Sequence, residues 1–139
     1  MRVLTTAVVL GLLLAGSAFG ENADPEIKPK KIQGTWERRI EKENLKVVVV
    51  KIITPTHLAI FHQTDSNGHH TLQGHGGTYE LKGNTFTEKY EFSSNENLIG
   101  KDSVSQLKLV GDELHQTWID NGRPRATEVW TRVKSPKRD

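Results

Sequence analysis

Apolar and polar residues alternate along most of the chain between residues 34 and 133, which is the period of a β-strand and not of a helix. The run from Gly76 to Phe92, GGTYELKGNTFTEKYEF, alternates on both sides of a Lys-Gly-Asn turn. Similar short runs follow one another, and each ends in turn residues such as Asn-Gly or Gly-Asp. The predicted strands are Gly34–Glu41, Lys46–Ile53, His57–Gln63, His70–Leu81, Thr85–Ser94, Ser103–Val110, Glu113–Asp120 and Thr127–Val133.

Consecutive strands joined by short turns predict an antiparallel sheet of up-and-down order. Such a sheet is best closed on itself, because closure removes its two exposed edges. We therefore predict an all-β fold, a single eight-stranded antiparallel up-and-down β-barrel. A barrel of this size has an interior that holds side chains or one small ligand.

The register of the central hairpin follows from its turn. A two-residue turn at Gly83-Asn84 places Glu88 on the inward, apolar face of the hairpin, although Glu88 is a charged residue. The pairs predicted across this hairpin are Leu81–Phe86, Tyr79–Glu88, Gly77–Tyr90 and His75–Phe92.

The last hairpin admits two registers. A two-residue Asn-Gly turn predicts Thr127 and Val129 inside the barrel, whereas a three-residue loop ending in Arg123 predicts Glu128 and Trp130 inside. We favour the second register because it buries the tryptophan.

The predicted interior mixes apolar residues with polar ones. Each buried polar group without a partner costs about 1–3 kcal/mol, so a cavity holding water or a polar ligand would satisfy them. The candidate cavity residues are His62, Gln73, His75, Tyr79, Glu88, Tyr90, Gln116, Trp118 and Trp130.

Glu88 is the main functional candidate of this set. A carboxylate enclosed by apolar residues suits a general acid or a hydrogen bond to a ligand. The alternative is a core carboxylate held by Tyr79 and by Gln116 or Arg38.

Several histidines lie in the same region and raise the question of a metal site. His69 and His70 point to opposite faces of their strand, and His69 and His75 are separated by roughly 20 Å of strand. Only His62 and His75 come from neighbouring strands in a way that lets them approach, whereas a structural zinc site needs four ligands. We predict no metal, no cofactor and no catalytic residue.

The first twenty residues predict a signal peptide. Arg2 precedes an apolar run that is short for a membrane span, and the small residues Ala18 and Gly20 suit cleavage after Gly20. The alternative is an uncleaved membrane anchor. We predict a secreted or periplasmic protein with no membrane contact after cleavage, a flexible lead-in (21–31), a barrel domain (32–134) and a disordered tail (135–139).

Charge and cysteine content narrow the function classes. The chain has 19 basic and 17 acidic residues, which argues against a nucleic-acid partner, since such proteins present a concentrated basic face. It has no cysteine, which excludes disulfides and thiol catalysis. An exported barrel without disulfides is held together by its core.

Two segments carry a family likeness. IQGTW (Ile32–Trp36) resembles the Gly-x-Trp signature of the first strand in lipocalins, and EVWTRV (Glu128–Val133) resembles their closing strand. Together with KIITPTHLAIF and the central hairpin, they look like the lipocalin-like domain of secreted bacterial proteins, over residues 32–134. The resemblance implies a calycin-type barrel with a small-molecule cavity, in which Arg132 lies across Trp36. The chain differs from larger lipocalins in lacking their disulfides and the helix after the barrel.

The leading hypothesis is a protein that binds a small, largely apolar or amphipathic molecule in the barrel cavity. One alternative is a structural or protein-interaction barrel with a filled core, whose contact would be the loop tip with Leu98 and Ile99. A further alternative is a barrel enzyme using Glu88 and His75 as acid and base.

Overall fold

The computed structural model describes residues 23–135, so the predicted signal peptide and most of the predicted tail lie outside the described residues. Within this range no helix is long and apolar enough to cross a membrane. The helical elements are α1 (Pro29–Ile32) and the 3-10 turn η1 (Glu96–Leu98). The strands are β1 (Gly34–Lys42), β2 (Leu45–Ile53), β3 (His57–Ser66), β4 (His69–Lys82), β5 (Thr85–Lys89), β6 (Phe92–Ser93), β7 (Asp102–Val110), β8 (Glu113–Asp120) and β9 (Arg123–Arg132).

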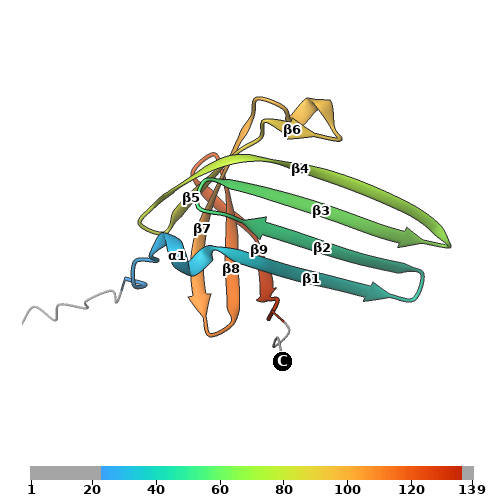
Figure 1. Ribbon diagram of the computed structural model, residues 1–139, viewed down its shortest axis with the longest axis horizontal. Coiled ribbons are helices and arrows are strands. Elements are labelled where there is room, and N and C mark those ends of the chain that lie inside the picture. The colour runs from blue at the N-terminus through green and yellow to red at the C-terminus, as the bar shows by residue number, and fades with distance from the viewer. Residues whose placement is uncertain (1–22, 136–139) are drawn as a thin grey trace, which may run out of the picture.

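The strands form a closed antiparallel barrel of eight, which confirms the predicted fold class. Strands β1 to β5 and β7 to β9 each pair with the next, and β9 returns to β1, while the short β6 lies outside the barrel and pairs with β4. The closure consists of two residue pairs, Trp36–Arg132 and Glu37–Thr131. Figure 1 shows β1 to β4 running side by side and projecting beyond β7, β8 and β9.

The core follows the alternation of the strands. Val49 and Ile53 of β2, Phe86 of β5 and Leu114 of β8 are at most 2% exposed. Burying a side chain of this size stabilises the folded state by about 1.5–3 kcal/mol. The barrel is therefore held by the inward faces that the sequence pattern predicts.

The described part of the predicted lead-in, residues 23–31, contacts the barrel, whereas its polar composition predicts a flexible chain. Ile27 is 7% exposed, and its backbone N–H donates to Asn84 Oδ1 at 2.8 Å. Asp24 lies 2.8 Å from Lys108 Nζ. One buried apolar side chain and several polar contacts hold this short polar segment, and composition averaged over the segment does not reveal them.

The register of the central hairpin is confirmed near its turn. Strands β4 and β5 pair Leu81 with Phe86 and Tyr79 with Glu88, as predicted. Glu88 therefore points into the barrel, where it is fully buried.

Farther from the turn the predicted register is wrong. His75 pairs with Ser93 and Gly76 with Phe92, so the predicted pairing of His75 with Phe92 does not form. The strand expected over Thr85–Ser94 is divided, because the chain leaves the ladder between β5 and β6. Phe92 is consequently 50% exposed, outside the barrel.

Gly77 explains the division. Its φ is +155°, and a Cβ at this position would lie 2.1 Å from the Lys89 carbonyl oxygen. The backbone N–H of Glu91 donates to the Gly76 carbonyl at 2.9 Å, while the N–H of Tyr90 donates to Lys101. A glycine that allows such close approach of another strand is a common site for a bulge.

The last hairpin buries Trp130 as predicted, but with a different turn length. Its turn has two residues, because Asp120 pairs with Arg123, so the predicted three-residue loop is wrong. A β-bulge in β9 before Thr127 then shifts the register by one residue. Trp130 is buried and Glu128 half-buried, as the favoured register predicts.

Candidate ligand cavity and the polar network beneath it

One end of the barrel interior holds a cavity of about 240 Å³. Its walls come from β3, β4, β7, β8 and β9, and from the segment between β5 and β7 that includes η1. The lining residues are Ile60, His62, His75, Tyr90, Leu98, Ser103, Trp118, Glu128 and Trp130. Most of them carry rings, so the cavity has flat walls with polar edges.

A fully buried polar network lies next to this cavity. The Lys51 ammonium donates to Glu88 Oε1 at 3.0 Å and to Gln116 Oε1 at 2.5 Å. Gln116 Nε2 donates to Glu88 Oε1 at 3.2 Å and to Ser105 Oγ at 3.0 Å. The Tyr90 hydroxyl donates to Glu88 Oε2 at 3.0 Å, which connects the network to the cavity wall. Both buried charges are thus paired and hydrogen-bonded, the arrangement that makes buried charge tolerable.

Two cations lie against the indole of Trp130. Lys51 Nζ is 4.4 Å from the ring centroid of Trp130, and the Arg38 guanidinium is 5.2 Å from it. Arg38 also forms a 2.7 Å ion pair with Glu128, and their side chains are 22% and 24% exposed. This pair joins β1 to β9 beyond the two residue pairs that close the barrel. It stands at the cavity wall, because Glu128 and Trp130 both line the cavity.

His62 and His75 form a ring pair in the cavity wall. Their centroids are 5.5 Å apart with planes inclined by 25°, and His75 meets Tyr90 edge-on at 5.0 Å. Burial lowers the pKa of both imidazoles, against the opposing charge of Glu128 near His62 and of Glu88 near His75. Both rings are therefore neutral at pH 7. Burial and the neighbouring Glu88 raise the pKa of Tyr90, which keeps its hydroxyl a hydrogen-bond donor.

The structure brings together five of the nine predicted cavity residues at the cavity itself. The five that line it are His62, His75, Tyr90, Trp118 and Trp130. Glu88 and Gln116 lie in the buried network and are 0% exposed. They support the wall through Tyr90 without forming part of it.

The remaining two predicted residues lie elsewhere. Gln73 shares the inward face with His62, but it is exposed on the projecting part of β4. The Tyr79 hydroxyl donates to the Thr54 carbonyl at 2.7 Å, and its ring packs on Phe86. Tyr79 is therefore not the partner of Glu88 that the core alternative names, and Lys51 takes that place.

Lys51 is the residue that sequence reasoning missed. The signal was present, because Val47, Val49, Lys51 and Ile53 share one face of an alternating strand. The position of Leu98 also differs from the one that the structural alternative expects. Leu98 lines the cavity from η1 and is not exposed at a loop tip.

The predicted stack of Trp36 and Arg132 is present. The Arg132 guanidinium is 4.0 Å from the Trp36 ring centroid, and it donates to the Gln33 and Lys31 carbonyls at 2.9 and 2.6 Å. Trp36 Nε1 donates to the Ile32 carbonyl at 2.8 Å. These contacts tie α1 to the first and last strands of the barrel, so their role is structural.

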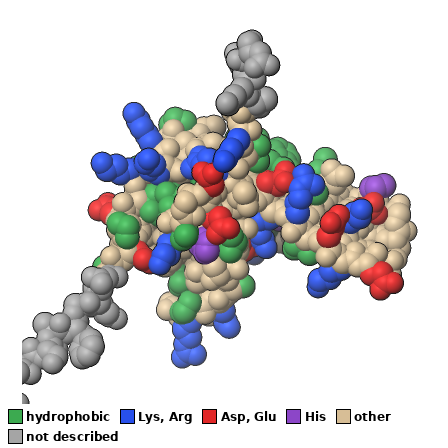
Figure 2. Space-filling view, turned by 90° about the horizontal axis from the view of Figure 1, so that it is seen from below, with side chains coloured by type: hydrophobic (Ala, Val, Ile, Leu, Met, Phe, Trp, Pro, Cys, Tyr) green, Lys and Arg blue, Asp and Glu red, His purple; other side chains and the backbone are tan. Residues whose placement is uncertain are grey.

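Within residues 23–135 no group of three or more His, Asp or Glu side chains is placed to hold a metal ion. The surface shown in Figure 2 carries Lys and Arg interspersed with Asp and Glu, without a large patch of one sign.

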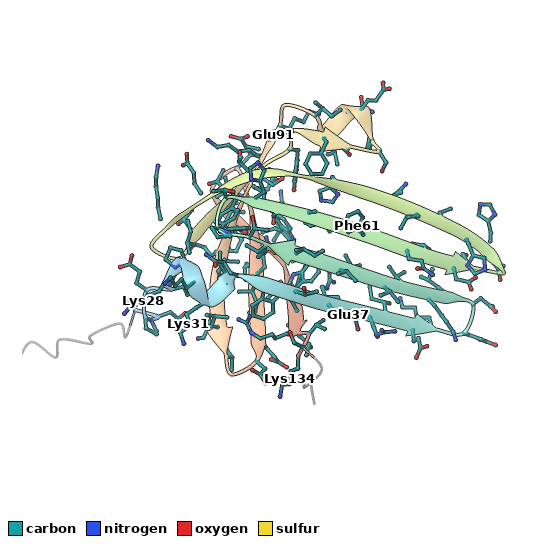
Figure 3. All side chains as sticks on the ribbon, in the orientation of Figure 1. Lys28, Lys31, Glu37, Phe61, Glu91 and Lys134 are labelled. Carbon is teal, nitrogen blue, oxygen red and sulfur yellow. The ribbon has the colours of Figure 1, made fainter. Side chains whose placement is uncertain are left out.

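An apolar hollow lies on the outer face of the barrel. It is lined in part by Phe61, Leu72 and Phe92, which are 44%, 71% and 50% exposed. Figure 3 labels Phe61 on β3, along the side-by-side strands.

A comparison with protein-family models matches residues 31–139 to the family described as a domain of unknown function, DUF4488. The chain therefore belongs to this family. Neither the curated proteins nor the solved structures contain a match to it.

Proposed function

We propose that this protein is an exported, lipocalin-like barrel that binds a small, largely apolar molecule in its interior. The observation that carries the proposal is the cavity of about 240 Å³, walled by two tryptophans, two histidines and a tyrosine. Concave sites with mostly apolar walls and a few convergent polar groups are typical of ligand pockets in proteins.

The buried polar network does not explain the cavity. Lys51, Glu88 and Gln116 satisfy one another, so the cavity is not needed to hydrate them. A barrel that served only as a scaffold would gain stability from filling this space, because empty volume forfeits contacts of the surrounding side chains. An open cavity beside a satisfied network is better explained by an occupant.

The lipocalin-like class rests on the barrel and on the Trp36–Arg132 stack. Export rests on the first twenty residues of the sequence, with their positive start, apolar run and small residues before Glu21. In this proposal the protein takes up its ligand outside the cytoplasm.

A structural or interaction barrel is the second candidate. It is favoured by the full hydrogen bonding of Glu88 to Lys51, Gln116 and Tyr90, which is what a core carboxylate requires. In the enzyme alternative, Glu88 and His75 would act as acid and base. Only His75 of these two lines the cavity, which makes that alternative the weakest.

Native mass spectrometry of the exported protein tests the proposal, with the same sample denatured as the control. The expected result is a discrete additional mass that is lost on denaturation. A bare polypeptide mass, whatever the amount of protein exported, together with no binding of cavity-sized ring compounds, would contradict the proposed binding function and favour the structural barrel.

A further inference from the structure

The charges around the cavity are already paired. Lys51 is bonded to Glu88 in the buried network, and Arg38 is bonded to Glu128 at the wall. An ionised ligand would lose its hydration without meeting a free opposite charge, which is costly in a low-dielectric site. The cavity therefore favours a neutral molecule.

The walls favour a flat molecule. Five of the nine lining residues carry rings, namely His62, His75, Tyr90, Trp118 and Trp130. Aromatic rings attract one another in offset-stacked or edge-to-face geometry, which adds about 0.5–1.5 kcal/mol per pair to the gain from burial. A planar aromatic ligand gains this stacking energy at several walls, whereas a branched aliphatic molecule of equal volume does not.

The imidazole nitrogens supply the polar contacts. In the described residues, His62 and His75 make ring contacts with each other and with Tyr90, and their nitrogens form no hydrogen bond. A neutral imidazole offers one N–H donor and one nitrogen acceptor. Polar atoms that are half-buried gain from a partner, so the ligand's edge should carry both a donor and an acceptor.

The volume limits the size of the ligand. A cavity of about 240 Å³ is below the usual range of about 300–1,000 Å³ for sites that hold drug-sized ligands. One or two fused rings fit such a space, and a long acyl chain does not. We propose that the cavity binds a neutral, planar compound of one or two fused rings, whose donor and acceptor edge is recognised by His62 and His75. This inference rests on the proposed function, because it names the ligand class of the same cavity.

Three probes of matched shape test the inference on the full exported protein. They are 2-quinolone, which is neutral with a donor and an acceptor, naphthalene, which has neither, and 2-naphthoate, which is an anion. Binding is measured by quenching of tryptophan fluorescence, since Trp118 and Trp130 line the cavity. We expect 2-quinolone to bind about tenfold more tightly than naphthalene, as one or two hydrogen bonds would provide, and 2-naphthoate to bind most weakly.

Variants assign the difference to the two histidines. His62→Phe and His75→Phe keep a ring but remove its nitrogens, so each should bring 2-quinolone towards the affinity of naphthalene and leave naphthalene unchanged. His69→Phe, at an exposed position of β4, is the matched control and should change nothing.

The outcomes separate this inference from the proposed function. Three outcomes would each overturn the ligand class while leaving a binding cavity. They are equal affinity for 2-quinolone and naphthalene, a difference in affinity that survives in both variants, and tightest binding of 2-naphthoate. If the exported protein carries an additional mass but binds none of the three probes, only the ligand class is overturned. If it carries no additional mass and binds none of them, both the ligand class and the proposed function are overturned.

Discussion

Lys51 Nζ lies 3.0 Å from Glu88 Oε1, and neither side chain is exposed to solvent. The two residues come from β2 and β5, on different parts of the barrel wall, and Gln116 of β8 bonds to both. A buried pair of this kind is stabilising only as a unit, since either charge alone would be desolvated without compensation. Together with Gln116 the pair joins three strands, and through Tyr90 it supports the wall of the cavity.

Removing one partner of this pair should be strongly destabilising. Lys51→Met leaves the Glu88 carboxylate enclosed without its counter-charge, and we expect a loss of about 3–5 kcal/mol in the free energy of unfolding. Urea denaturation followed by tryptophan fluorescence measures the loss. Lys82→Met breaks an exposed pair with Glu80 and should hardly change stability.

The double variant Lys51→Met/Glu88→Leu checks that the loss comes from an unpaired charge. We expect it to be more stable than the sum of the two single effects predicts, by about 2 kcal/mol, because it removes both charges together. Additive losses would show that Lys51 and Glu88 do not act as a pair.

The Trp36–Arg132 stack should tolerate lysine only in part. Arg132→Met removes the cation–π contact and two hydrogen bonds to backbone carbonyls, for an expected loss of about 2–3 kcal/mol. Arg132→Lys keeps the charge but not the planar fork, so it should recover less than the full stability. Thermal unfolding of the two variants, compared with Arg125→Lys on the surface, measures the difference, and equal stability of Arg132→Lys and the wild type would contradict a role for the fork.

Acid should weaken the fold through the two cavity histidines. Burial lowers the pKa of His62 and His75 below the ordinary value of 6.5, so between that value and the folded pKa the unfolded chain binds more protons than the folded one. The free energy of unfolding therefore falls as the pH drops from about 6.5 through the folded pKa.

The charged groups that act on the pKa of His62 are Glu128, Arg38 and Lys51, and those that act on His75 are Glu88, His62 and Lys51. Urea denaturation at a series of pH values should show a smaller fall in this window for His62→Phe/His75→Phe than for the wild type. The His69→Phe control should follow the wild type, and an unchanged fall in the double variant would assign it to other groups.

Glycine at position 77 should be indispensable for the division between β5 and β6. A Cβ there would lie 2.1 Å from the Lys89 carbonyl oxygen, at a φ of +155° that side chains rarely adopt. Gly77→Ala should cost about 2–4 kcal/mol from strain and displacement of the neighbouring strand. Gly68→Ala, at positive φ but in open space, should cost about 1 kcal/mol. Similar losses at both positions, measured by chemical denaturation, would mean that close packing at Gly77 is relieved cheaply.

The fold was predictable because alternation and turn residues are local signals. The Lys-Gly-Asn turn sets the register of Leu81 with Phe86, and that register alone places Glu88 inside the barrel. Burial of Trp130 was predictable from its size, although the wrong turn length was chosen to achieve it. Neither the bulge in β9 nor the division opposite Gly77 follows from the turn residues, because a turn sets the register only up to the first irregularity of the ladder.

Part of the cavity was predictable because strand register, like alternation, can be inferred from local sequence. His62 and His75 follow from the register of β3 and β4, and both line the cavity. The partner of Glu88 did not follow, because Lys51 reaches it across the barrel interior from a strand that does not neighbour β5 in the sheet. Leu98 reaches the wall through a 3-10 turn, whose direction no alternation pattern predicts.

The most direct test of a ligand in the cavity is native mass spectrometry of the exported wild type beside two variants. Ser103→Phe fills part of the cavity from its wall, and Lys101→Phe adds the same ring at an exposed position close by in the chain. An additional mass on the wild type and on Lys101→Phe, but not on Ser103→Phe, is the predicted result. A mass retained by Ser103→Phe would place the occupant elsewhere, and bare protein in all three would contradict a bound ligand.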